Sequence, residues 1–162
     1  MTSLTLVRRI AARPAIVFEA LTTADGIAAW WGPVEIEARV GGAYRVRFRS
    51  EDGREHEVCG ECLEVIEPVR LVMSYRWALG GEPEEFGRVS RIEFVLRPIE
   101  GGTELTFTHA DLKNAASQEA HGGGWTGALA RLERYVATVL LERRPDSVSD
   151  ENMSSALSPR TR

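Results

Sequence analysis

The stretch "GWTGALARLERYVATVLLE", Gly124–Glu142, decides the fold because its apolar residues recur at helical spacing. One stripe of this stretch carries Trp125, Leu129, Leu132, Val136 and Leu140. The pattern predicts an amphipathic helix of roughly 18–25 residues. A helix with one apolar stripe needs an apolar surface to cover, and the preceding sequence indicates what that surface is.

The residues before this helix alternate between apolar and polar side chains, which is the period of a half-buried strand. The clearest examples are residues 43–50, 70–77 and 103–112. Turns that contain glycine, such as Asp52-Gly53, separate these segments and are typical of hairpins. We therefore expect about six antiparallel strands in this part of the chain.

Two short helices are predicted between a first strand, residues 3–11, and this run of strands. Pro14 fits the first turn of one helix, where its missing N–H costs nothing. Thr23 can cap the second helix with its side-chain oxygen. The strands and helices are thus segregated along the chain rather than alternating.

The second short helix ends in "AAWWGP", Ala28–Pro33, where two tryptophans are adjacent. Ile27, Trp30 and Trp31 lie at i, i+3 and i+4, so they share one side of the helix. Gly32 suits the position just after a helix, and the proline blocks its continuation. Because adjacent helical residues diverge by about 100°, we expect one indole to fill the core and the other to line a cavity or its mouth.

The predicted fold class is α+β. A curved antiparallel sheet of about six to seven strands wraps on the long C-terminal helix, and two short helices follow the first strand. A helix laid across a strongly curved sheet leaves room beneath it, so a cavity is predicted between them. We expect one domain over residues 1–144. Residues 145–162, rich in Ser, Pro and charge, are predicted to form a disordered tail.

The composition excludes several classes of partner. The formal net charge is −4 and Lys113 is the only lysine, which argues against general nucleic-acid binding. The apolar runs are too short to span a bilayer, and the N-terminus lacks the pattern of a secretory signal. We therefore predict a cytoplasmic protein with no nucleic-acid partner and no membrane span.

The sequence assigns no catalytic residue, metal or cofactor. Cys59 and Cys62 form a C-x-x-C pair, but they lie in a predicted strand, where residues three apart point to opposite faces. There is no second cysteine pair to complete a zinc site, so both cysteines are interpreted as structural. Phosphate-binding loops, Ser-His-Asp sets and zinc-helix motifs are absent from the sequence.

Aromatic side chains dominate the inward positions of the predicted strands and helices. Ligand pockets are mostly apolar with few polar groups, so this set predicts a partly open cavity, although each residue alone is also typical of a filled core. The residues predicted to line the cavity are Trp30, Trp31, Tyr44, Phe48, Met73, Tyr75, Trp77, Phe94, Phe107, His109, Trp125 and Leu129.

His109 is the most informative polar residue of this set. It could bond a ligand or act as a general acid or base, since histidine titrates near neutrality. The favoured interpretation is a histidine at the edge of the core, bonded to the backbone or to Tyr75. Three glycines, Gly122–Gly124, are predicted to be a flexible loop before the long helix that opens and closes one end of the cavity.

The sequence resembles the helix-grip fold of the START and birch-pollen-allergen superfamily, also called SRPBCC. Within it, the chain is similar to the branch related to the C-terminal domain of the activator of the heat-shock-protein-ninety ATPase. The resemblance covers about residues 4–142 and is specific only as a set of segments. The segments that carry it are "PAIVFEAL" (14–21), "AAWWGP" (28–33), "GGAYRVRF" (41–48), "GECLEVIEPVRLVMSYRW" (60–77), "RIEFVLRPIEGGTELTFTHADL" (91–112) and "GGGWTGALARLERYV" (122–136).

Three functions remain open from the sequence. The first is binding of an apolar or aromatic small molecule in the cavity, without covalent chemistry. The second is a stress-related or chaperone-associated interaction protein, whose partner would be another protein bound at the outer sheet face or the tail. The third is a cyclase- or hydrolase-type enzyme with His109 or a carboxylate as acid–base. An aromatic surface and an exposed edge strand allow either a monomer or a homodimer.

Overall fold

The computed structural model describes residues 1–143 of the 162. A single seven-stranded antiparallel sheet has the order β1-β7-β6-β5-β4-β3-β2. Its strands are β1 (Thr2–Ile10), β2 (Val34–Ile36), β3 (Ala43–Arg49), β4 (Glu55–Ile66), β5 (Arg70–Leu79), β6 (Ser90–Ile99) and β7 (Gly102–Leu112). The predicted tail, 145–162, lies outside the described residues.

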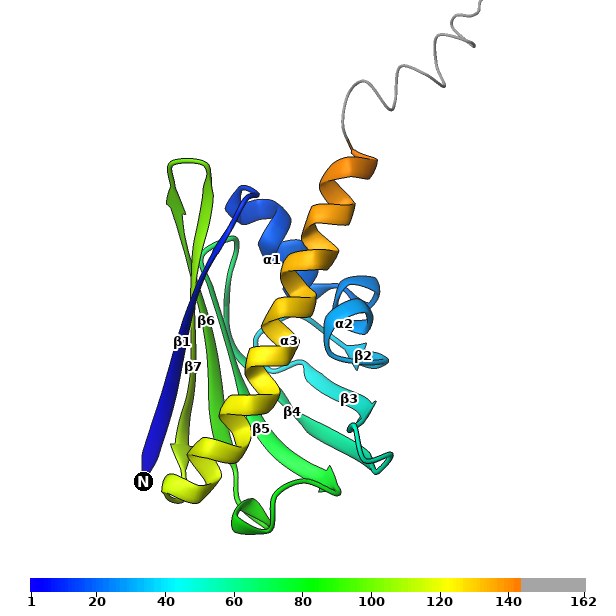
Figure 1. The fold of residues 1–162 in the computed structure, drawn as a ribbon, viewed down its shortest axis with the longest axis vertical. Coiled ribbons are helices and arrows are strands. Elements are labelled where there is room, and N and C mark those ends of the chain that lie inside the picture. The colour runs from blue at the N-terminus through cyan, green and yellow to red at the C-terminus, as the bar shows by residue number, and fades with distance from the viewer. Residues whose placement is uncertain (144–162) are drawn as a thin grey trace, which may run out of the picture.

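Three α-helices lie on one side of this sheet, and α3 (Ala115–Glu142) runs diagonally across it (Figure 1). The short helices α1 (Pro14–Thr22) and α2 (Ala24–Trp30) lie beside the C-terminal half of α3. A 3-10 turn, η1 (Pro83–Glu85), lies in the β5–β6 connection. The α+β arrangement, the two short helices after the first strand and the long covering helix are confirmed.

The core fills the space between the sheet and α3. Its largest fully buried side chains come from every layer, with Trp30 on α2, Phe94 and Phe107 on the central strands, and Leu129 and Leu132 on α3. The spacing of the α3 residues is the helical period that the sequence predicts. The stripe from Trp125 to Val136 is therefore what holds the helix on the sheet.

The end of α2 forms as the glycine and proline predict. Thr23 Oγ1 accepts a hydrogen bond from Gly26 N at 3.1 Å, which caps the start of the helix. At the other end, the Gly32 N–H donates to the carbonyl oxygen of Ile27 at 3.1 Å. A Cβ atom at Gly32 would lie 2.1 Å from the carbonyl oxygen of Arg47, so the close approach of β3 requires glycine here.

The start of α3 differs from the prediction. The helix has 28 residues and begins at Ala115, so Gly122–Gly124 lie inside it and do not form a loop. Its start is fixed by Asn114, whose Oδ1 accepts from Ser117 N at 3.0 Å. Because this cap lies eight residues before the first glycine, the helix is already established when it reaches the glycine run.

The glycine run nevertheless weakens α3 without serving its packing. A Cβ atom at Gly122, Gly123 or Gly124 would meet nothing within 4 Å. Glycine inside a helix is less favourable than alanine by about 0.5–1 kcal/mol per residue. The packing of α3 therefore gives no steric reason for glycine at these three positions.

We predict that replacing all three residues, Gly122–Gly124, by alanine raises the free energy of unfolding by about 1.5–3 kcal/mol. Urea unfolding followed by circular dichroism measures this change. Gly26→Ala in α2 is the opposing control, since its Cβ would lie 2.7 Å from the Cα atom of Ala20, and it should lower stability. An unchanged or lower stability of the triple variant would contradict the prediction.

Candidate functional site

The predicted cavity residues come together between the sheet and α3. All of them are buried except Phe48 and Trp77, which are partly exposed. Rings stand close to one another across the whole set, with Phe107 and Trp125 centroids 4.3 Å apart and Tyr75 and Trp125 centroids 6.0 Å apart. The site is thus a closed aromatic cluster with one partly exposed end.

The two adjacent tryptophans take different roles. The indole N–H of Trp30 donates to the carbonyl oxygen of Ala20 at 2.9 Å, so this ring is tied to α1 inside the core. Trp31 stacks on Tyr75, with centroids 6.3 Å apart and ring planes 8° apart. Its ring also lies 5.2 Å from that of Trp125 on α3. Trp30 therefore fills the core, and Trp31 faces the sheet–helix interior.

His109 is held in a defined neutral form. Its Nδ1 accepts from the indole N–H of Trp125 at 3.0 Å, so Nε2 carries the proton and donates to Ser90 Oγ at 2.8 Å. Burial, helped by repulsion from His121, lowers the pKa of His109 to about 2. His109 is fully buried in the core rather than at its edge, and its bonding partners are Trp125 and Ser90. With Tyr75 it makes a ring contact and no hydrogen bond, with the two ring centroids 4.5 Å apart.

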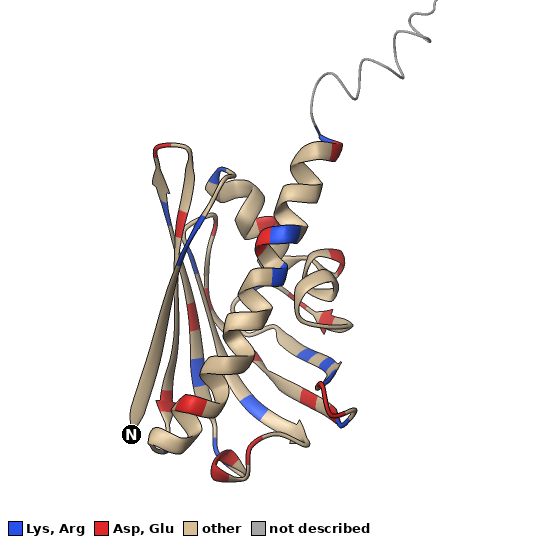
Figure 2. Cartoon of the chain, in the orientation of Figure 1, with Lys and Arg blue, Asp and Glu red and all other residues tan. Residues whose placement is uncertain are grey.

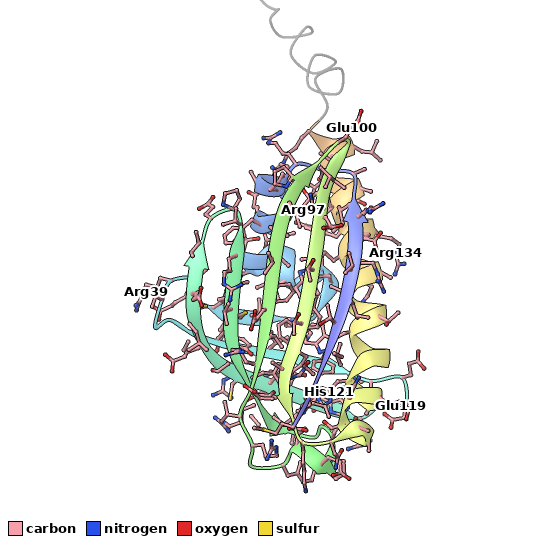
Figure 3. The ribbon with its side chains drawn as sticks, turned by 90° about the vertical axis from the view of Figure 1, so that its left-hand side faces the viewer. Arg39, Arg97, Glu100, Glu119, His121 and Arg134 are labelled. Atoms are coloured by element: carbon pink, nitrogen blue, oxygen red, sulfur yellow. The ribbon has the colours of Figure 1, made fainter. Side chains whose placement is uncertain are left out.

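His121 is a second interior histidine, and the sequence analysis missed it. Its Nε2 accepts from the indole N–H of Trp77 at 3.3 Å, which leaves Nδ1–H to donate to the carbonyl oxygen of Ser117 at 2.9 Å. Figure 3 places His121 on the N-terminal part of α3, at the opposite end of the molecule from Glu100. His121 lies four residues before Trp125, and this spacing would place both on one side of a helix. The prediction of a loop at Gly122–Gly124 hides this signal, because it starts the helix after His121.

Glu85 fastens the first turn of α3 to the β5–β6 connection. Its Oε2 accepts from Lys113 N at 2.8 Å and from Ser117 Oγ at 2.5 Å. Although burial raises the pKa of this carboxyl group, these hydrogen bonds and Arg88 lower it overall. Nothing local in the sequence marks Glu85 as a contact of α3, because the two segments meet only in the folded chain.

The partly exposed end of the cluster lies where β3, β4 and β5 approach the start of α3. The Trp77 ring lies 5.6 Å from Tyr75 and 6.0 Å from Phe48. Phe48 in turn stacks on His56 at 5.2 Å. An unbroken row of rings therefore leads from the buried Trp31 and Tyr75 to the surface at Phe48.

Two surface hollows lie elsewhere. One, of about 900 Å³, covers the outer face of β2–β5 and is lined by residues that include Tyr44, Cys59 and Gly60. The other, of about 170 Å³, lies between α1 and α3. Of the predicted cavity residues, only Tyr44 lines either hollow. It lies opposite Gly60 in the β3–β4 ladder, and its hydroxyl donates to the carbonyl oxygen of Ser74 at 2.6 Å.

Comparison with protein families identifies this architecture. Residues 11–137 match the model of the family described as Activator of Hsp90 ATPase homolog 1-like protein. The chain belongs to this family. A comparison with curated proteins finds no match.

Solved structures of similar proteins have the same helix-grip fold. Protein CV1439 from Chromobacterium violaceum is 26% identical, with 83% of this chain and 96% of that chain covered and a TM-score of 0.71. MLL2253 from Mesorhizobium loti is 22% identical over 85% and 98% of the two chains, with a TM-score of 0.70. The Aha1 dimer from Colwellia psychrerythraea is 24% identical over 84% and 96%, with a TM-score of 0.62. The superfamily resemblance and its branch are thereby confirmed.

Outside the cluster, this member of the family carries mixed charges. Glu57 pairs with both Arg45 and Arg47, and Arg49 pairs with Glu55 at 2.7 Å. Figure 2 shows basic and acidic positions interspersed along the strands. No helix in residues 1–143 combines the length and apolar character that crossing a bilayer requires. The same residues contain no group of three side chains suited to hold a metal ion.

We predict that His109 makes stability pH-dependent below neutrality. Its folded pKa is depressed, so the unfolded chain binds the extra proton, and stability is lost as pH falls below about 6.5. Between about pH 7.5 and 5.5 the loss is about 1.4 kcal/mol. His109→Gln removes this contribution while His56 and His121 remain, so the stability difference between the two proteins should shrink by that amount. Urea unfolding at both pH values tests it, and an equal difference at both would contradict it.

Proposed function

We propose that the protein binds an apolar or aromatic small molecule between the sheet and the N-terminal half of α3. The observation that carries this proposal is the row of rings from Trp31 and Tyr75 to the partly exposed Trp77 and Phe48. Aromatic side chains offer large apolar contact area with specific geometry, and pockets lined by them suit flat apolar ligands. The interior histidines are bonded to the indoles, with the Nδ1 atom of His109 and the Nε2 atom of His121 each accepting an indole hydrogen bond.

The route into the site is the start of α3. Gly122–Gly124 make this part of the helix intrinsically weak, and opening there separates His121 from Trp77. The bonds that hold the segment closed include Ser117 to Glu85 at 2.5 Å, Asn114 to Glu84 at 2.9 Å and His121 to Trp77 at 3.3 Å. Segments of low local stability open more readily than the rest of a fold, and ligand-binding regions are often drawn from them. In this proposal the glycines let one end of the site open and close, as predicted for a loop, but they do so from within the helix.

A protein-interaction role is the second candidate. It is favoured by the exposed apolar side chains of Phe86 and Val89, which are 58% and 59% exposed in the β5–β6 connection. The family description, Activator of Hsp90 ATPase homolog 1-like protein, is compatible with such a role. The outer arginines do not add to it, because Arg45, Arg47 and Arg49 are paired with glutamates.

The enzyme hypothesis receives less support from the same residues. A general acid or base works best when its pKa lies near the operating pH, whereas burial holds the pKa of His109 at about 2. Both ring nitrogens of His109 are also occupied by Trp125 and Ser90. The geometry therefore suits His109 to organising the interior.

We predict saturable binding of the apolar fluorescent probe N-phenyl-1-naphthylamine at one molecule per chain. The Gly122–Gly124 triple alanine variant should slow probe association at least about tenfold, because each alanine disfavours opening of the segment. Stopped-flow fluorescence measures the rate, and native mass spectrometry of freshly purified protein reports retained ligand and subunit number.

Gly127→Ala is the matched control for this experiment. It lies in α3 beyond Trp125, and its Cβ would have ordinary contact with Arg131 Nη1 at 3.5 Å. It should strengthen the helix without changing the association rate. The absence of saturable probe binding would overturn the proposed function, and equal slowing by both variants would overturn the route.

A further inference from the structure

The polar groups of the aromatic interior are almost completely paired with one another. Trp125 and Ser90 occupy both nitrogens of His109, and Trp77 and Ser117 occupy both nitrogens of His121. The hydroxyl of Ser90 donates onward to the carbonyl oxygen of Tyr75 at 3.3 Å. Such full pairing is the rule for buried polar groups, so any group left over calls for an explanation.

Two groups in this interior are left over, and they are neighbours. Within residues 1–143, neither the indole N–H of Trp31 nor the hydroxyl of Tyr75 has a hydrogen-bond partner. Trp31 is 9% exposed and Tyr75 is 4% exposed, so both side chains are at least nine-tenths buried. Their rings are almost parallel, with centroids 6.3 Å apart. The closed interior thus contains two unused donors, carried by neighbouring rings.

We infer that Trp31 and Tyr75 form the polar recognition point of the site, for a neutral aromatic ligand that carries a hydrogen-bond acceptor such as a carbonyl oxygen. This inference rests on the proposed function and specifies its ligand class. An acceptor oxygen placed beside the stacked rings would satisfy donors that the protein itself leaves unpaired. The aromatic body of the ligand would lie among the surrounding rings of the cluster.

The charges around the site select a neutral ligand. Burial raises the pKa of Tyr75, and the negative charges of Glu82 and Glu85 raise it further, so the hydroxyl stays a donor. The same two carboxylates oppose a ligand anion near this point. The ring nitrogens of both interior histidines are occupied, so they offer no free acceptor to a ligand N–H.

The two buried tyrosines provide a first test without any ligand. Tyr75→Phe removes an unpaired hydroxyl, so the melting temperature should be unchanged or higher. Tyr44→Phe removes a hydroxyl bonded to Ser74 at 2.6 Å, so the melting temperature should fall. If Tyr75→Phe destabilises the ligand-free protein as much as Tyr44→Phe does, the Tyr75 hydroxyl is satisfied internally and the inference is overturned.

The second test uses 9-fluorenone and fluorene, which have nearly the same shape but differ in the carbonyl oxygen. We expect the preference of the protein for the ketone over the hydrocarbon to fall roughly fivefold in Tyr75→Phe. It should also fall in Trp31→Phe, which keeps a ring but lacks the N–H, and stay unchanged in Tyr44→Phe. Displacement of the naphthylamine probe gives the affinities. Comparing ratios between proteins removes the different water solubilities of the two compounds.

The outcomes separate the inference from the proposed function. If both compounds displace the probe but neither variant changes the ratio, the site binds apolar molecules and the recognition point is wrong. If neither the probe nor the two compounds bind to the unmodified protein, the proposed function fails and the inference fails with it. A fivefold loss confined to the ketone in Tyr75→Phe supports both.

Discussion

The hydrogen bond from Trp125 to His109 joins the long helix to the sheet, and the interior is arranged around it. Trp125 is the first residue of the apolar stripe of α3, and its ring also packs on Phe107 and Trp31. Because the indole can only donate, the facing nitrogen of His109 must be an acceptor. That single requirement fixes the histidine as neutral and directs its remaining N–H to Ser90.

The second pair, Trp77 and His121, repeats this chemistry at the partly exposed end. There the direction of attachment is reversed, since the tryptophan lies on the sheet and the histidine on the helix. The two pairs flank Tyr75, whose ring centroid lies 4.5 Å from His109 and 6.0 Å from His121. The helix residue of the deeper pair, Trp125, lies in the apolar stripe of α3, whereas the helix residue of the outer pair, His121, lies just before the glycines. The glycines therefore separate the outer pair from the apolar stripe that holds the rest of the helix on the sheet.

Much of this architecture follows from the sequence, and the exceptions have physical causes. Alternation predicts the strands and the 3.6-residue period predicts α3, because each pattern reflects which side faces the core. Trp30 and Trp31 could not be distinguished, since the choice depends on a carbonyl of α1 that only the folded chain brings close. The start of α3 was misplaced because glycine normally argues against helix, while Asn114 and Glu85 hold the helix from outside the glycine run. The residues of the predicted cavity follow from the periodicity of apolar side chains alone. Periodicity shows which side chains point inward, but not whether an open space remains between them.

Two costs to stability occur in the N-terminal part of α3 and the interior that it covers, and together they carry the functional argument. Three glycines weaken the helix where a Cβ atom would meet nothing, and the interior beneath it retains two unpaired donors. A core that served only to hold the fold together would gain stability from alanine in the helix and from phenylalanine at Tyr75. Both costs become useful if the segment opens and a ligand then completes the hydrogen bonding inside. A resident ligand acceptor would thus explain the weak helix and the unpaired donors by one event.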